Sequence, residues 1–327
     1  MIDRRLFLSG LAATGLGSTT GGHARAGVYP DHLVTIVVPF PPGGNSDIVG
    51  RRIADRLSSI LGQSVIIEHR PGGAGGMVGA KSVASAQPDG HTLLLSSPSP
   101  LVVAAAVYQN LGYDPIKSFA PIARLFSIPQ LLAINPAVPA TSLQELVAYA
   151  KANPGVINFA SPGYGTQPHL LGEMLRLATG INIVHVPYKG PAQALTDLLS
   201  GQVQMYFETT GLLLPHVEAG KLKALAVADE MRCSQLPTVP TTTECGFPKL
   251  QATFWSGILA PAGTPASIID KLNTEINDVM KSPEMQTSLI KLSANSKIGS
   301  PQDFAAFIAV ERKKWSEVAK AAGIKAV

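Results

Sequence analysis

Residues 34–47 read Val-Thr-Ile-Val-Val-Pro-Phe-Pro-Pro-Gly-Gly-Asn-Ser-Asp, an apolar, β-branched run that ends in a proline- and glycine-rich loop. A short run of this kind is typical of a buried parallel strand. Residues 48–61 then carry apolar side chains at helical spacing with charged ones between them. Asn45, Ser46 and Asp47 are residue types that cap the start of a helix. The stretch therefore predicts a strand, a loop and a helix in succession.

The same unit recurs along the chain. We expect further strands at residues 65–68, 92–96, 131–134, 158–160, 182–186, 203–208 and 224–228. We expect further helices at residues 77–86, 142–153, 167–179, 192–200, 212–219, 266–281 and 301–322. Alternating strands and helices predict an α/β layer fold. A chain of 327 residues is long for a single core and favours two lobes.

The first 26 residues have the character of an export signal. Arg4 and Arg5 precede a weakly apolar stretch, and Ala24-Arg25-Ala26 offers the small residues that a signal peptidase requires. The paired arginines fit a twin-arginine signal, and a Sec signal is the alternative. We expect a periplasmic protein that begins near Gly27.

Charge and cysteine content narrow the function classes. Removing residues 1–26 takes away three arginines and one aspartate, so the net charge falls from +4 to +2. A nearly neutral chain without a basic stripe argues against nucleic-acid binding. Cys233 and Cys245 would lie in an oxidising compartment, where a disulfide between them is an option that the sequence leaves open.

Three loops rich in glycine, serine and proline follow predicted strands, at residues 40–47, 96–100 and 161–166. In open parallel sheets, ligands bind outside the carboxyl ends of the strands, at helix N-termini. Glycines let backbone N–H groups approach a ligand closely, and helix N-termini attract anions. These loops therefore predict an anionic ligand held mainly by the backbone.

Seven motifs, in order along the chain, carry a family resemblance. They are residues 40–47 (FPPGGNSD), 70–76 (RPGGAGG), 161–166 (SPGYGT) with His169, 185–190 (HVPYKG), 197–203 (DLLSGQV), 236–241 (LPTVPT) and 260–265 (APAGTP). With these motifs the chain resembles a Bug-type receptor, the substrate-binding protein of the tripartite tricarboxylate transporter family. The resemblance runs from about Tyr29 to the C-terminus.

The resemblance implies a type II periplasmic-binding-protein fold, with two lobes joined by two crossover strands near residues 122–134 and 253–259. Lobe 1 would comprise residues 27–126 and 253–327, and lobe 2 residues 127–252. In this family a ligand carboxylate is held by main-chain N–H groups and ordered water between loops of both lobes. The matching positions are Gly43, Gly44 and Asp47 in lobe 1, and Ser161, Gly163, Gly165 and Thr166 in lobe 2.

Further residues at the same loops are candidates for ligand contact. They are Phe40 and Tyr164 as cleft walls, Asn45 and Ser46 at the first helix, Ser97 after a strand, His169, Tyr188 and Glu208. Glu208 would lie near the cleft and disfavour a second ligand carboxylate unless it is protonated. The expected partners are a small organic carboxylate and the membrane permease subunits of the transporter, with a monomer as the default state.

Enzymatic alternatives have little support. Ser161 lacks the preceding glycine of a G-x-S-x-G motif, and no H-E-x-x-H or P-loop sequence occurs. A Rossmann-like oxidoreductase is the strongest enzymatic alternative, but the turn at residues 71–76 does not fit its fingerprint. The histidines lack the spacing of a metal site, so we expect neither metal nor cofactor. A periplasmic sensor with the same fold is the other alternative.

Overall fold

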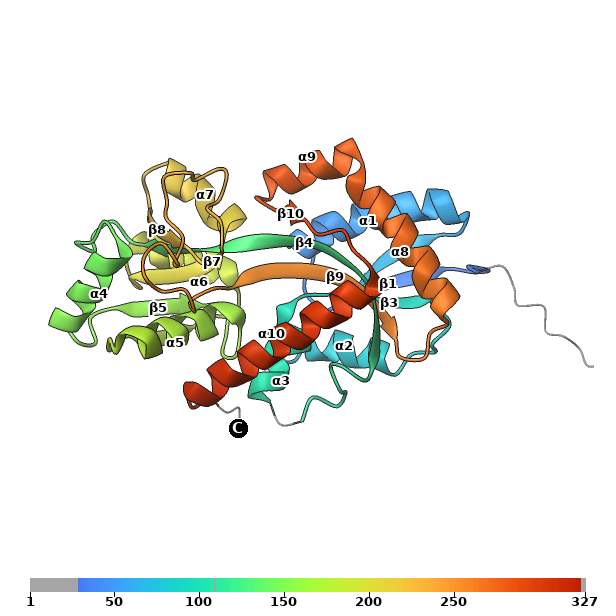
Figure 1. Ribbon diagram of the computed structural model, residues 1–327, viewed down its shortest axis with the longest axis horizontal. Coiled ribbons are helices and arrows are strands. Elements are labelled where there is room, and N and C mark those ends of the chain that lie inside the picture. Colours follow the sequence, from blue (N-terminus) through green and yellow to red (C-terminus); the bar gives the residue numbers. More distant parts are fainter. Residues whose placement is uncertain (1–28, 109, 325–327) are drawn as a thin grey trace, which may run out of the picture.

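The computed structural model describes residues 29–108 and 110–324. Its first half is built on a parallel arrangement in which one strand lies between two others (Figure 1). The strands are β1 (Val34–Val38), β2 (Val65–His69) and β3 (Thr92–Ser96), and the helices between them are α1 (Asn45–Leu61) and α2 (Met77–Ala84). β1 is the central strand, which explains its apolar, β-branched sequence.

The second half repeats this plan. β5 (Asn158–Ser161) pairs in parallel with β6 (Val184–Pro187) and β7 (Met205–Thr209). Its helices are α4 (Leu143–Ala152), α5 (Gln167–Thr179), α6 (Pro191–Ser200) and α7 (Thr210–Glu218). β8 (Lys223–Val227) completes this half.

Two antiparallel strands run between the halves (Figure 1): β4 (Phe119–Ile134) and β9 (Thr253–Pro261). The middle of β4 also pairs with the short β10 (Asn295–Ser296), and its last part pairs with β7 and β8. Ten consecutive residues of β4, 125–134, are buried because the strand is covered along this length. The two expected crossover strands are therefore present.

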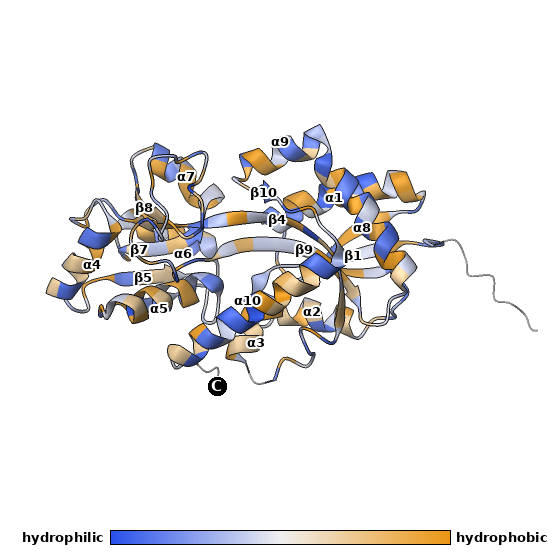
Figure 2. Ribbon diagram, in the orientation of Figure 1, coloured by the Kyte–Doolittle hydropathy of each residue, from blue (hydrophilic) through white to orange (hydrophobic). Residues whose placement is uncertain are grey.

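The chain ends in three helices, α8 (Ala266–Lys281), α9 (Pro283–Lys291) and α10 (Pro301–Ala321). α8 and α9 pack against α1 of the first half. α10 contacts β4, α3 (Ala104–Val107) and α5, so it touches elements of both halves. Its ribbon alternates between hydrophobic and hydrophilic residues (Figure 2), and the buried ones include Phe304, Ile308 and Trp315. The buried side of this helix therefore packs within the fold.

Several short helical elements were not predicted from the sequence. These are α9, α3, the single turn η1 (Ala74–Gly76) and the π-type turn η2 (Ser99–Val103). Helical periodicity needs two or three turns to be recognised, and three of these elements are too short to show it. The consequence is that the loop expected at residues 96–100 leads directly into a buried helical turn.

The disulfide that the sequence left open is absent: Cys233 and Cys245, both in the described part of the chain, are free and buried. Cys233 packs in a hydrophobic cluster with Leu236 and Val239. Cys245 belongs to a different cluster, with Leu250 and Ala252. A disulfide between them is therefore a wrong expectation, because each thiol serves as a small apolar side chain in its own cluster.

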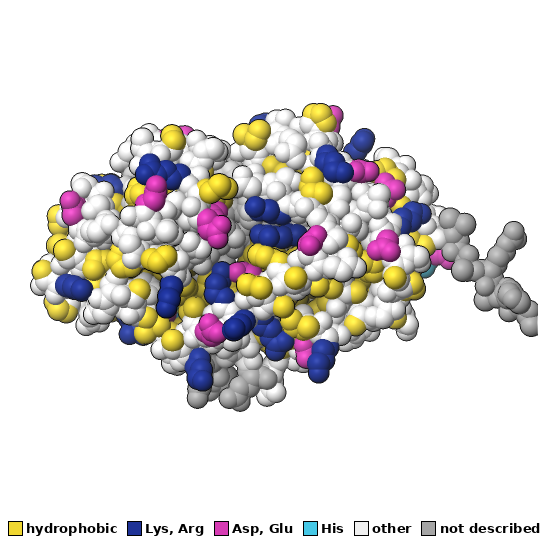
Figure 3. All heavy atoms as spheres, in the orientation of Figure 1, with side chains coloured by type: hydrophobic (Ala, Val, Ile, Leu, Met, Phe, Trp, Pro, Cys, Tyr) yellow, Lys and Arg dark blue, Asp and Glu magenta, His cyan; other side chains and the backbone are white. Residues whose placement is uncertain are grey.

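Charged side chains of both signs lie on the surface. On the face shown in Figure 3, Lys and Arg side chains are interspersed with Asp and Glu. Among the described residues, none of the helices is both long enough and apolar enough to cross a membrane.

Candidate functional site

The N-terminus of α1 is open. Its N-cap is Gly44, in an extended conformation with φ −77°, and no side chain of the described residues caps it. A cap at Asn45, Ser46 or Asp47 would require the helix to begin one to three residues later, so that expectation is wrong. Ser46 is 6% exposed, and its buried Oγ has no hydrogen-bond partner among the described residues. A polar group and a positive helix end are thus available to an anion at this position.

Asp47 fixes the loop rather than the helix start. Its Oδ2 accepts a hydrogen bond from the Gly43 N–H at 2.9 Å, and its Oδ1 lies 3.0 Å from Arg51 Nε and 3.1 Å from His69 Nε2. Burial raises the pKa of Asp47, but the Gly43 and Arg51 contacts together outweigh it and hold the pKa below its ordinary value. The Gly43 amide is therefore already engaged, and the amides beyond Gly44 are the ones open to a ligand.

The glycine-rich turn at residues 71–76 packs against this loop on one side and against Ser99 on the other. Gly76 has φ +89°, and an added Cβ there would lie 2.8 Å from the Pro39 carbonyl oxygen and 3.3 Å from the half-buried Phe40 ring. An added Cβ at Gly75 would lie 3.1 Å from Ser99 Cβ. The glycine-rich turn at residues 71–76 thus has a structural role, because its glycines permit these close contacts. Ser97 is buried just after β3.

The corresponding loop of the second half is tied together by hydroxyl groups. Ser161 Oγ donates to the Gly163 carbonyl at 2.9 Å and accepts from the Gly163 N–H at 3.2 Å. Thr166 Oγ1 donates to the same carbonyl at 2.7 Å. Thr166 is the N-cap of α5, but its hydroxyl is used in this way and does not cap the helix. Among the described residues, α5 therefore also begins without a side-chain cap.

Two stacked histidines lie beneath this loop. The rings of His169 and His185 have centroids 3.8 Å apart. The Gly165 N–H donates to His169 Nδ1 at 3.1 Å, and His185 Nε2 lies 2.6 Å from Ser161 Oγ. Burial lowers the pKa of His169 to about 3 and that of His185 to about 4. His169 is only 2% exposed and acts as a support for the loop.

The two predicted tyrosines differ in their surroundings. Tyr164 is 44% exposed, with its ring 4.8 Å from that of His169, so its outer face is open to a ligand. The Tyr188 hydroxyl donates to Asp197 Oδ2 at 2.8 Å. Burial and this carboxylate raise the pKa of Tyr188 to about 12. Its N–H is bonded to the Ser161 carbonyl, so Tyr188 braces the loop.

Glu208 is turned inward. It is 8% exposed, and its two oxygens accept hydrogen bonds from the Tyr206 hydroxyl at 2.6 Å and the Thr209 N–H at 2.8 Å. Burial raises its pKa above the ordinary value. Both carboxylate oxygens are satisfied within β7, so the structure gives no reason for Glu208 to select against a second ligand carboxylate.

Residues that the sequence analysis missed connect the α5 terminus to both crossover strands. Gln130 Nε2 on β4 donates to Gln167 Oε1 at 3.1 Å, and Gln167 Nε2 donates to the Thr253 carbonyl on β9 at 3.0 Å. The buried Gln130 Oε1 has no hydrogen-bond partner within the described residues. The polar Gln130 inside the apolar run of β4 was the feature of the sequence that could have indicated this contact.

The two halves also touch directly. An added Cβ at Gly165 would lie 3.1 Å from Val107 Cγ1 of α3. An added Cβ at Gly211, in the first turn of α7, would lie 2.7 Å from the carbonyl oxygen of Leu292, just after α9. The loop that precedes α5 therefore packs against α3, and the first turn of α7 packs against the residue that follows α9.

The family model described as tripartite tricarboxylate transporter family receptor matches residues 49–324. The chain belongs to this family. The receptor is 37% identical to BugT of Bordetella pertussis over 319 residues, which cover 96% of this chain and 98% of BugT. The expected resemblance to Bug-type receptors is confirmed.

Solved structures of relatives have the same fold. The structure of R. palustris Rpa4515 with adipate has a TM-score of 0.83 and 35% identity, and the match covers 91% of this receptor and 100% of that chain. MatC from Rhodopseudomonas palustris with bound malate has a TM-score of 0.79 and 33% identity, covering 89% of this receptor and 99% of MatC. The two-lobed periplasmic-binding-protein fold is therefore confirmed. The receptor is a member of a family of periplasmic solute-binding proteins rather than of an enzyme family.

Proposed function

We propose that the receptor binds a small organic carboxylate between its two lobes and delivers it to the membrane permease of a tripartite tricarboxylate transporter. The observation that carries the proposal is the buried, unpartnered Ser46 hydroxyl at the uncapped N-terminus of α1. Buried hydroxyls are almost always hydrogen-bonded, so this one is suited to a ligand acceptor. The adjacent helix terminus favours a negative charge.

A dicarboxylate is the ligand class that fits best. α1 and α5 each begin without a side-chain cap among the described residues, and they belong to different halves. One helix terminus could hold each carboxylate of a ligand that spans the two lobes. Rpa4515 and MatC were solved with adipate and malate, both dicarboxylates. The proposed contacts are the residues of the loops at 40–47 and 161–166, with Tyr164 as an open wall.

The proposal also includes the boundaries of the two lobes and the export of the receptor to the periplasm. Lobe 1 would comprise residues 27–126 and 253–327, and lobe 2 residues 127–252. Residues 1–26, which lie outside the described residues, would direct export by the twin-arginine or the Sec route and be removed. The mature receptor would bind and release its ligand in the periplasm unchanged, without a catalysed reaction.

A thermal-shift screen of the protein from Gly27 onward tests the ligand class. Malate, succinate, adipate, citrate, benzoate and glutamate would each be added at equal concentration. A ligand that binds only the native state raises the melting temperature, and we expect the dicarboxylates to give the largest rise. No rise from any of the six acids would refute the proposed ligand class.

Delivery requires a separate test in cells. In a strain that lacks the receptor gene but keeps its permease, uptake of the radiolabelled ligand found in the screen should be lost. Uptake should return when the receptor is supplied. Unchanged uptake in the deletion strain, with the binding result intact, would leave the binding site standing and refute the delivery step.

A further inference from the structure

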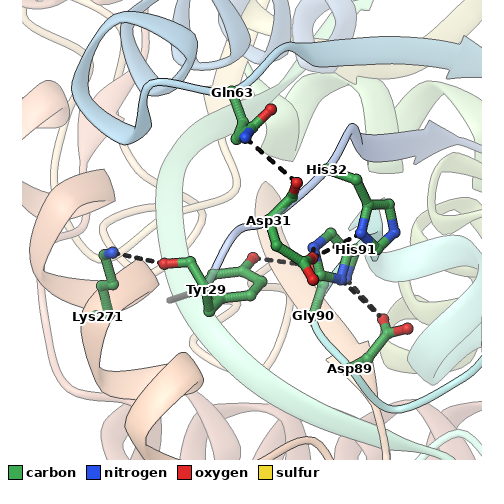
Figure 4. Close-up of polar contacts among 8 residues, drawn as sticks. All are labelled: Tyr29, Asp31, His32, Gln63, Asp89, Gly90, His91 and Lys271. Atoms are coloured by element: carbon green, nitrogen blue, oxygen red, sulfur yellow. Dashed lines mark hydrogen bonds and ion pairs between the residues drawn. The ribbon is translucent and has the colours of Figure 1, made fainter. Parts of the chain in front are cut away.

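Three potential metal ligands meet at the edge of the first half, away from the loops described above. Asp31 and His32 precede β1, and His91 precedes β3. Because β1 and β3 are neighbouring parallel strands, the residues just before them are brought side by side. One ligand atom from each of the three residues lies within 4.8 Å of the other two. Figure 4 shows the three side chains converging, with Asp89 beside them.

The contacts within this cluster are short. Asp31 Oδ1 lies 2.7 Å from His32 Nδ1 and 3.1 Å from His91 Nε2. The other nitrogen of His91, Nδ1, lies 3.4 Å from Asp89 Oδ1, which also accepts a hydrogen bond from the His91 N–H. The same carboxylate oxygen of Asp31 thus lies near a nitrogen of each imidazole, and it is hydrogen-bonded to His32.

The ring nitrogens of His91 are a second observation that indicates a bound cation. Its side chain is only 11% exposed, and both ring nitrogens are buried without a hydrogen bond to any described residue. Asp31 and Asp89 are near enough, but their oxygens lie in the wrong direction for hydrogen bonds. A buried polar atom without a partner calls for a physical cause. A cation next to Nε2 would supply the missing partner.

We propose that Asp31, His32 and His91 form a binding site for a divalent transition-metal ion, specifically Zn²⁺. Two imidazoles and one carboxylate, with a fourth position left to water, form a donor set that Zn²⁺ accepts in tetrahedral geometry. Asp89 beside His91 Nδ1 orients the ring from the second shell of ligands. Nothing in the binding or delivery of a carboxylate requires this ion, so the site is separate from the proposed function.

The site needs a small adjustment when the ion enters. The rings of His32 and His91 are stacked at 3.6 Å with an interplanar angle of 11°, whereas a metal must lie in the plane of each ring. His32 and Asp31 have side chains 62% and 66% exposed, so they can turn freely. His91 is held in place by its surroundings. The buried histidine thus anchors the ion, and the two exposed residues close around it.

A bound ion would fasten residues 29–32 to the rest of the first half. Tyr29 Oη donates to the Gly90 carbonyl at 2.8 Å, and Lys271 Nζ donates to the Tyr29 carbonyl at 2.8 Å (Figure 4). Gln63 Nε2 adds a bond to the Asp31 carbonyl at 3.3 Å. Zn²⁺ would join this segment to the strand start at His91. Because only the folded chain presents the three ligands together, binding should also raise the melting temperature.

The test uses the protein from Gly27 onward without a histidine tag, stripped with a chelator and then dialysed against ZnCl₂ in a buffer without organic acids. Bound metal is measured by elemental analysis. We expect one Zn²⁺ per chain and a raised melting temperature. H91A and H32A should lose the bound ion, whereas H216A, which removes an imidazole on α7, should keep it.

Two outcomes would overturn the site. One is wild-type protein that binds no zinc. The other is H32A that keeps stoichiometric zinc; this variant changes an exposed residue, so it remains informative if H91A fails to fold. Anomalous scattering at the zinc edge in crystals should place the ion at His91 Nε2, and an ion elsewhere would equally refute the proposal. None of these results bears on carboxylate binding.

Discussion

His169 and His185 stack with an interplanar angle of 19°, and each ring is bonded to the loop at residues 161–166. His169 Nδ1 accepts a backbone N–H, so that nitrogen carries no proton. A second charge on a ring 3.8 Å away would be strongly repelled. The loop that precedes α5 therefore rests on two neutral imidazoles, and its geometry is linked to pH.

The first prediction concerns acid stability. The pKa values of about 3 for His169 and about 4 for His185 lie below the ordinary value of 6.5. The free energy of unfolding is therefore not reduced by this pair above pH 6.5. It decreases as the pH falls toward 4, because the unfolded chain takes up protons that the folded chain excludes. The free energy of unfolding in urea should be measured at pH 7, 6 and 5. Its slope against pH should approach the value for about two protons taken up on unfolding.

H169Q separates this pair from the other titrating groups. The glutamine can accept the Gly165 N–H but cannot take a proton, so the pH slope should fall by about one proton. H216Q, outside the stack, should keep the wild-type slope. Identical slopes in H169Q and the wild type would show that the pair is not responsible.

The second prediction tests the α1 terminus. An added Cβ at Gly44 would meet no atom within 4 Å, and the backbone there is extended, so G44V should fold normally. Its side chain would fill the space in front of the helix amides, and binding of the dicarboxylate found in the screen should be lost. G190V is the matched control, because Gly190 is also an N-cap glycine in open space, at α6. Titration calorimetry with equal losses in both variants would argue against a site at α1.

The third prediction concerns the contact between the two halves. In G211A the new methyl group would lie 2.7 Å from the Leu292 carbonyl oxygen, so α7 and α9 must separate. If the strain costs about 1–3 kcal/mol, ligand affinity should fall by about 5- to 150-fold. G172A serves for comparison: its methyl group would lie 2.2 Å from the Phe159 ring, inside one half. That variant should lose stability to urea instead, and the reverse pattern would contradict the interpretation.

The fourth prediction concerns the buried Glu208. Y206F removes the hydroxyl that donates to Glu208 Oε2 and leaves a buried carboxylate oxygen without a partner. The free energy of unfolding at pH 7 should fall by about 1–3 kcal/mol. Y149F is the control, because the Tyr149 hydroxyl makes no hydrogen bond to the described residues. Equal urea midpoints for Y206F and wild type would show that Glu208 is protonated or solvated in another way.

Much of this fold was predictable from the sequence. The helix at residues 167–179 begins and ends as expected, because Thr166 and Gly180 are typical flanking residues and the apolar spacing between them is regular. The alternation of strands and helices and the Bug-type motifs likewise determined the fold class and the family. These signals are local, so each can be recognised in a window of a few residues.

The tertiary structure decided how the polar groups are used. From the sequence, Asp47 was a helix cap, Glu208 a cleft residue, and Cys233 and Cys245 a potential disulfide. In the structure Asp47 binds the Gly43 amide, Glu208 binds Tyr206, and the thiols lie in separate clusters. Only strand pairing brings His91 to Asp31 and His32. The partner of a hydrogen bond or metal ligand is set by contacts between residues far apart in the chain, which no local pattern records.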